Sequence, residues 1–108
     1  MIRKSFLIQV KEGMAGEYER RHNPIWPGLA EIFKKHGVQK FSINLHEKTG
    51  CLFGYIEVEN EEGYNAIGDY DVCKKWWKHM AEILVCENEQ SEKGKEESLR
   101  EVFFLNNY

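Results

Sequence analysis

The stretch KFSINLHEKTGCLFGYIEV, residues 40–58, decides the fold that the sequence predicts. Its first half alternates apolar and polar side chains from Phe41 to Leu45, which is typical of a strand with one buried face. The letters EKTG then supply a turn, and the chain returns as a second strand from Leu52 to Val58. The sequence therefore predicts a β-hairpin at the centre of the molecule.

The N-terminal side of this hairpin predicts one strand and an interrupted helical stretch. Residues 2–10 alternate apolar and polar side chains, which again indicates a strand with one buried face. Residues 14–22 show helical spacing, which places Tyr18 and His22 one turn apart on the same face. The letters NPIWP break this helix, because a proline disfavours helical conformation in the residue before it. A second helix is expected over residues 27–36, with a proline as its first residue.

The C-terminal side predicts a short helix at 61–67 and a longer one at 72–85, with Asp71 as the N-cap of the longer helix. Four residues of the longer helix have the spacing of a stripe that faces the core. They are Cys73, Trp77, Met80 and Leu84. Adjacent helical residues point about 100° apart, so Trp76 is expected on the flank of this stripe.

The last part of the chain predicts a loop and a final strand. Residues 86–98 are polar and charged without periodicity, as in a surface loop, and LREVFFL at 99–105 is expected to close the chain as a strand. The order is then strand, helix, strand, strand, helix, strand. This order predicts an α+β, ferredoxin-like split β-α-β domain, with an antiparallel sheet and both helices on one face. Residues 1–108 are expected to form this single domain.

A sheet covered by helices on one side leaves its other face bare. Apolar residues occur on both faces of the predicted strands: Leu7 lies beside Phe6, Phe53 beside Leu52, and Phe103 in the last strand. An exposed apolar face of that size usually marks a partner surface. The simplest partner is a second copy, so we expect a homodimer in which two sheets close face to face as a dimeric α/β barrel.

Composition excludes several classes of protein. The chain has 108 residues, a net charge of −3 and a pI near 5.8, so it lacks the basic surface that a nucleic-acid-binding protein needs. Its three cysteines are widely spaced, as expected for reduced thiols rather than a disulfide framework. The opening MIRKSFLIQV does not resemble a signal peptide, and no apolar run reaches the length of a membrane span. A soluble, cytoplasmic protein without membrane association is expected.

Tyr18 and His22 form the first candidate site. Imidazole both gives and takes a proton near neutral pH, as a reaction that runs in both directions requires. The alternative is a helix face packed on the sheet, with both polar tips satisfied by hydrogen bonds. A helix C-terminus raises the pKa of a histidine and desolvation lowers it, and the sequence leaves open which effect prevails at His22.

Trp76 and Trp77 form the second candidate site. Indole offers a flat platform to the C–H face of a sugar, and its N–H can bond to a hydroxyl. The alternative is that both are bulky core residues. Elsewhere, His36, His46 and His79 lack ligand spacing such as H-E-x-x-H, and no Gly-rich phosphate loop occurs. We therefore expect neither a metal site nor a cofactor.

Two segments together resemble the L-rhamnose mutarotase family. They are EYERRHNPIWP at residues 17–27 and DVCKKWWKHM at residues 71–80, and the opening MIRK and closing EVFFL extend the resemblance over essentially the whole chain. The resemblance implies a dimeric α/β barrel that interconverts the α and β anomers of L-rhamnose, a 6-deoxy sugar, without a cofactor. It is an isomerase activity of the aldose 1-epimerase type.

The resemblance also implies roles for individual residues. His22 matches the proton-donating catalytic histidine of the family, and Tyr18, Trp76 and Trp77 match its substrate-binding residues. Our hypothesis is that His22 delivers a proton to the ring oxygen of the sugar and recovers it when the ring closes. A second group, which the sequence does not identify, acts at the anomeric hydroxyl.

One position departs from the family pattern, because Phe41 stands where the family has a tyrosine. The ring is kept and the hydroxyl is lost, which can cost about 1–3 kcal/mol at a buried polar site. Asn44 on the same strand, or a water molecule, is expected to replace the hydroxyl. Three alternatives stay open: a mutarotase for another 6-deoxy sugar such as L-fucose, a non-catalytic sugar-binding module, and a haem- or quinone-handling monooxygenase on the same barrel.

Overall fold

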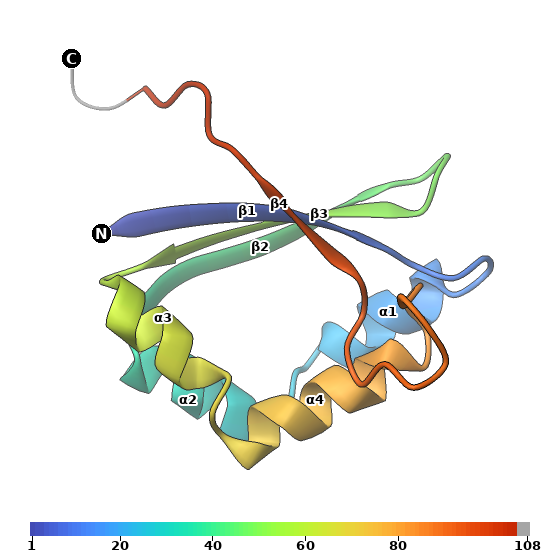
Figure 1. The fold of residues 1–108 in the computed structure, drawn as a ribbon, viewed down its shortest axis with the longest axis horizontal. Coiled ribbons are helices and arrows are strands. Elements are labelled where there is room, and N and C mark those ends of the chain that lie inside the picture. Colours follow the sequence, from blue (N-terminus) through green and yellow to red (C-terminus); the bar gives the residue numbers. More distant parts are fainter. Residues whose placement is uncertain (106–108) are drawn as a thin grey trace.

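The structure is a computed structural model that describes residues 1–105. Within these residues the chain forms a sheet whose helices all lie on one side of it (Figure 1). The elements, in order, are β1 (Ile2–Gln9), α1 (Ala15–His22), α2 (Pro27–Lys35), β2 (Val38–His46), β3 (Cys51–Val58), α3 (Glu61–Ile67), α4 (Asp71–Ala81) and β4 (Glu96–Leu99).

The sheet has the strand order β2-β3-β1-β4, and all of its neighbouring strands are antiparallel. β2 and β3 form the predicted hairpin, in which Phe41 lies opposite Ile56 and Leu45 lies opposite Leu52. β1 pairs with β3 on one side and with β4 on the other. The ferredoxin-like α+β prediction is confirmed.

Local interactions stabilise α1 and mark where α2 and α3 begin or end. In α1, Glu17 forms an ion pair of 2.8 Å with Arg21, one turn further along the helix. Pro27 occupies the first turn of α2, where its missing N–H costs nothing, and Gly37 follows that helix with a φ of +82°. The side chain of Asn60 caps α3 by accepting a hydrogen bond of 2.7 Å from the Gly63 N–H.

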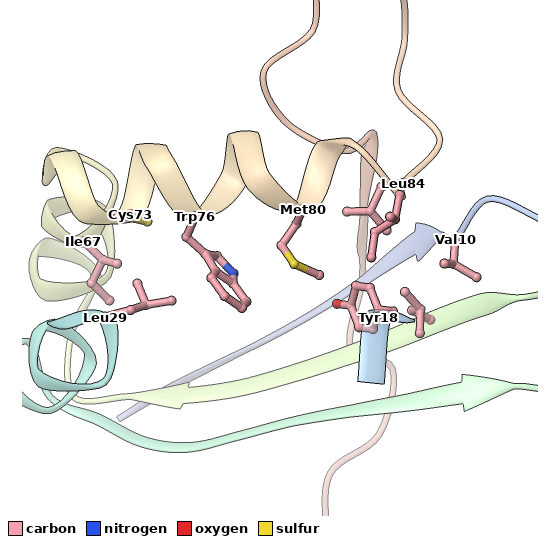
Figure 2. Packing of buried hydrophobic residues seen from close by; sticks show 10 residues of the cluster. Val10, Tyr18, Leu29, Ile67, Cys73, Trp76, Met80 and Leu84 are labelled. Carbon is pink, nitrogen blue, oxygen red and sulfur yellow. The ribbon is translucent and has the colours of Figure 1, made fainter. Parts of the chain in front are cut away.

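The hydrophobic core lies between the helices and the covered face of the sheet (Figure 2). Its buried cluster comprises Val10, Tyr18, Leu29, Leu52, Ile67, Cys73, Trp76, Met80, Ile83 and Leu84. Phe6 lies directly opposite Gly54 in the sheet, and a Cβ on Gly54 would come within 2.1 Å of the Phe6 ring. Only glycine therefore allows the Phe6 ring to lie against the β3 backbone.

The structure corrects three details of the α4 prediction. Trp76 is 7% exposed and belongs to the core, whereas Trp77 is only half-buried, so the prediction had the two reversed. Spacings of three and of four residues both fit a helical stripe, so packing decides which tryptophan faces the core. Here the Trp26 ring meets the Trp76 ring edge to face, with the ring centres 5.1 Å apart. Asp71 is the first helical residue, not the N-cap, and the helix ends at Ala81.

The prediction of the last strand was wrong. β4 lies at Glu96–Leu99, inside the segment expected to be a loop, while residues 100–105 form no strand. β4 pairs with β1 through backbone hydrogen bonds, with Ile8 opposite Glu96, and such an edge strand needs no alternating apolar pattern. Beyond β4 the chain extends away from the sheet (Figure 1), and Glu101 is held there by an ion pair of 2.8 Å with Arg3.

The sheet face opposite the helices carries exposed apolar side chains, as expected. Phe53 is 44% exposed and Leu99 41% exposed. On the segment that follows β4, Phe103 is 73% exposed. Homodimer formation over this face stays a prediction. No helix within residues 1–105 is both long enough and apolar enough to cross a membrane.

Candidate active site

A cavity of about 290 Å³ lies between the helices and the covered face of the sheet. All four residues predicted for the site line it, although they come from two helices far apart in the sequence. They are Tyr18, His22, Trp76 and Trp77. Its volume lies near the lower end of the range for small-molecule pockets, about 300 Å³.

His22 is the last residue of α1, and one hydrogen bond determines its tautomer. Its Nδ1 lies 2.9 Å from the backbone carbonyl oxygen of Tyr18. A carbonyl can only accept, so Nδ1 donates and Nε2 is the nitrogen left to exchange a proton with a ligand. Burial lowers the pKa of His22, and the hydrogen bond to the Tyr18 carbonyl opposes this only in part. Desolvation therefore prevails over this hydrogen bond.

Tyr18 stands beside His22 with its ring almost wholly buried. The two ring centroids are 4.4 Å apart, and Tyr18 is 7% exposed. Burial, assisted by the negative charge of Glu96, raises the pKa of Tyr18 to about 12. The Tyr18 hydroxyl therefore keeps its proton at neutral pH and can donate a hydrogen bond to a sugar hydroxyl.

The two tryptophans form different parts of the cavity wall. Trp76 meets the His22 ring edge to face, with centroids 5.2 Å apart and planes at 87°. Trp77 lies on the flank of α4, where the Nζ of Lys93 sits 4.2 Å from the centre of its ring. The structure therefore places one indole against the histidine and the other under a charged side chain.

Phe41 also lines the cavity, where the centre of its ring lies 5.5 Å from the centre of the Phe33 ring. Asn44, which was expected to replace the missing hydroxyl, lies on the other face of β2 from Phe41, and its role stays a prediction. Phe41 lies opposite Ile56 and Asn44 opposite Phe53, and positions three residues apart on a strand point to opposite faces of the sheet. Asn44 does not line this cavity.

The comparisons with known proteins identify the family of the chain. A family model described as L-rhamnose mutarotase matches residues 3–105. The chain belongs to the L-rhamnose mutarotase family. A curated L-rhamnose mutarotase from Salmonella newport (strain SL254) is 44% identical over 97% of this chain and 99% of its own length.

Two solved structures show a likeness within the family and a weaker one outside it. An L-rhamnose mutarotase from Formosa agariphila matches with a TM-score of 0.84 and 28% identity, over 98% of this chain and all of that one. A putative antibiotic biosynthesis monooxygenase from Nitrosomonas europaea matches with a TM-score of 0.65 and 12% identity, over 95% of this chain and all of that one. The second likeness shows a shared fold alone.

Four polar residues of the cavity wall were missed by the reasoning from sequence and from the L-rhamnose mutarotase resemblance. They are Tyr64, Asn65, Lys93 and Glu96. Tyr64 and Asn65 lie on the short helix α3, whose sequence has no feature that marks a site. Lys93 and Glu96 belong to the segment 86–98, which covers one side of the cavity. Placing the last strand at 96–99 would have put Glu96 on the same face as Ile8.

A second cavity of about 680 Å³ adjoins the first along β2. It shares Tyr18, His22, Phe41 and Trp76 with the smaller cavity, and it adds polar groups that include Glu19 and Asn44. His22 therefore stands in a wall common to both cavities. Among residues 1–105, no group of three or more histidine, cysteine or acidic side chains is arranged to hold a metal ion.

Proposed function

We propose that this protein is a mutarotase that interconverts the α and β anomers of L-rhamnose without a cofactor. The observation that carries the proposal is that His22, Tyr18, Trp76 and Trp77 line one small cavity in a chain of the L-rhamnose mutarotase family. His22 is the proposed catalytic residue, and the other three are the proposed substrate-binding residues.

The chemistry of the cavity suits a 6-deoxy sugar. Its walls are mainly aromatic and aliphatic, so they can contact the C–H face and the methyl group of the pyranose. The Tyr18 hydroxyl, which keeps its proton, can orient a sugar hydroxyl. His22 exchanges its proton through Nε2: protonation of the ring oxygen opens the ring, and its deprotonation on closure restores the imidazolium.

Anomer exchange on L-rhamnose, measured by NMR saturation transfer with and without the protein, tests this function. We expect catalytic amounts of wild-type protein to transfer saturation between the two anomeric protons. In the His22→Ala variant we expect the exchange rate to fall by about 10²–10⁴-fold, the usual contribution of a general acid–base group. Circular dichroism serves as the check that the variant stays folded. Wild-type protein that leaves exchange at the uncatalysed rate would overturn the function.

A different 6-deoxy sugar is the second candidate, and Phe41 is the observation that favours it. The missing hydroxyl removes one hydrogen bond that the family tyrosine can offer, so the preference among sugars can differ from that of the relatives. L-Fucose in the same exchange measurement separates the two sugars. Binding of rhamnose without any change in its exchange rate would favour a non-catalytic sugar-binding module. Visible absorbance or oxygen uptake would favour a monooxygenase.

The assembly and location are part of the proposal. We infer that residues 1–108, of which the structure describes 1–105, act as one mutarotase domain in a cytoplasmic homodimer. The exposed apolar face of the sheet, with Phe53 at its centre, supports pairing of two copies as a dimeric α/β barrel. The activity is assigned to the isomerases, as an epimerase of the aldose 1-epimerase type.

A further inference from the structure

Mutarotation needs two proton-transfer groups, and His22 is only one of them. Opening the ring removes a proton from the anomeric hydroxyl and adds a proton to the ring oxygen, on two different atoms of the sugar. Closing the ring on the other face reverses both transfers. A side chain that completes the reaction must therefore share the cavity with His22 and be able to give and take a proton.

Glu96 is the only carboxylate among the described residues that line the cavity. It belongs to β4 and lies opposite Ile8 of β1, whose side chain lines the same cavity. Glu96 lines the cavity, and its side chain is 27% exposed, so it is not sealed from solvent. It therefore stands on the β4 side of the cavity, whereas His22 is carried by α1.

Several groups on other elements face this carboxylate. Burial raises the pKa of Tyr18 from α1 and of Tyr64 from α3, and the negative charge of Glu96 raises both further. Lys93, from the segment before β4, places its Nζ 3.7 Å from Glu96 Oε2. His22 completes the set on the cavity wall. Two phenols and one ammonium group thus lie near the carboxylate, and the proposed catalytic imidazole lines the same cavity.

Lys93 links the carboxylate to the sugar-binding wall. The same Nζ that pairs with Glu96 lies 4.2 Å from the centre of the Trp77 ring. A cation held over an indole has a preferred position, because the face of the ring is electron-rich. Lys93 therefore lies between the carboxylate and a proposed substrate-binding residue.

We propose that Glu96 is the second acid–base group of the mutarotase. This inference rests on the proposed function and names the group that acts at the anomeric hydroxyl. The Glu96 carboxylate takes the anomeric proton, and the electrons of that O–H bond form the C1 carbonyl. The bond from C1 to the ring oxygen breaks, and its electrons remain on the ring oxygen, which takes the proton from His22 Nε2.

Ring closure returns both protons to their donors. The open chain rotates about its C1–C2 bond and presents the other face of the carbonyl. The ring hydroxyl attacks that face while its proton passes back to His22 Nε2. The carbonyl oxygen takes its proton from Glu96 and becomes the anomeric hydroxyl. Protein charge and proton count are unchanged over the cycle, and no oxidant, reductant or co-reactant takes part.

The pH dependence of anomer exchange tests this inference. The active form has an ionised Glu96 and a protonated His22, so the wild-type rate is expected to rise and then fall with increasing pH. Glu96→Gln keeps the size of the side chain and removes its ionisation. We expect this variant to exchange anomers about 10²–10⁴-fold more slowly and to lose the low-pH limb of the profile.

Two further variants make the outcome decisive. Glu92→Gln changes an exposed carboxylate on the same segment, outside both cavities, and is expected to keep the wild-type rate and profile. Glu96→Asp keeps an ionisable group, so it is expected to restore a low-pH limb at a reduced rate. It also replaces Glu96→Gln as the test if the amide variant fails to fold, with an unchanged rate then counting against the inference.

The results separate the inference from the function on which it rests. Wild-type exchange together with a normal rate in Glu96→Gln would overturn the role of Glu96 and leave the mutarotase standing. A slower Glu96→Gln variant that keeps the low-pH limb would reduce Glu96 to a residue that only holds the sugar, which also overturns the inference. Absence of wild-type exchange on rhamnose and on fucose would overturn both.

Discussion

At His22, burial and a single hydrogen bond act on different properties of the same ring. The bond to the Tyr18 carbonyl determines which nitrogen carries the permanent proton, while burial determines how readily the second proton binds. Because burial lowers the pKa, the neutral ring is the stable form at neutral pH. In the proposed mechanism, His22 donates its proton from the smaller protonated population.

The lowered pKa of His22 predicts a loss of stability in mild acid. An unfolded histidine binds a proton at about pH 6.5, whereas the folded one resists it to lower pH. As the pH falls below that value the unfolded state binds more protons, and the free energy of unfolding decreases by at most about 1.4 kcal/mol per pH unit. The decrease ends once the pH is below the folded pKa.

Urea unfolding of wild-type protein and of His22→Gln between pH 7.5 and pH 5 measures this effect. Other titrating groups contribute to both proteins, so the difference between the two curves isolates His22. We expect wild-type protein to lose more stability than the variant over this range. A variant that loses as much or more would show that the folded His22 ring is not held neutral.

At the scale of elements, the sequence predicts best the segments whose ends are marked by residues with special backbone geometry. The letters NPIWP separate α1 from α2, Gly37 ends α2, and the EKTG turn defines the hairpin. Each signal acts within a few residues, so it can be read without knowing the fold. The shared helix face of Tyr18 and His22 was predicted in the same way, since their helical spacing is local, whereas their roles are implied by the family resemblance.

The errors arose where a distant partner decides the structure. β4 is a polar edge strand that exists because β1 offers it backbone hydrogen bonds, so hydropathy does not reveal it. Trp76 and Trp77 both suit the core by composition, and packing against Trp26 and His22 selects Trp76. Glu96 was missed for the same reason, because its place in the site depends on where β4 begins.

Gly54→Ala is expected to destabilise the hairpin that organises the sheet. The added Cβ would lie 2.1 Å from the Phe6 ring, which forces either the ring or the backbone of β3 to move. Overpacking of this kind costs about 1–3 kcal/mol. Phe6 also lines the cavity, so its displacement is expected to slow anomer exchange. Chemical denaturation and the exchange rate measure the two effects.

Gly16→Ala provides the matched control for that substitution. Gly16 lies in α1, and a Cβ there would meet no atom within 4 Å. Alanine is favoured over glycine in a helix by about 0.8–1.0 kcal/mol, so this variant is expected to be at least as stable as wild type. Equal stability of Gly54→Ala and Gly16→Ala would show that Phe6 does not require the glycine.

At the scale of the whole molecule, the helices cover one face of the sheet and leave the other open. Phe53 and Leu99 lie on that open face, and Val102, Phe103 and Leu105 extend the exposed apolar surface along the segment after β4. A second copy would cover both regions at once. Stable interfaces bury about 800 Å² on each partner, which a four-stranded sheet and its extension can supply.

Phe53→Lys is expected to convert the proposed dimer into a monomer, because pairing would bury the new charge without a partner. Sedimentation equilibrium of wild-type protein and of the variant measures the change in mass. Glu89→Gln changes the net charge by the same amount on an exposed part of the segment 86–98, and is expected to leave the mass unchanged. A monomeric wild-type protein would contradict the dimeric barrel directly.

The aromatic wall of the cavity has a practical consequence for studying this protein in solution. Its sequence contains three tryptophans; two of them line the cavity, and the third, Trp26, packs edge to face against Trp76. Indole emission depends on the polarity and the quenching groups within a few ångströms of the ring. The intrinsic fluorescence of the chain therefore originates almost entirely at the proposed binding site, so the molecule carries a built-in optical reporter of sugar occupancy that requires no label.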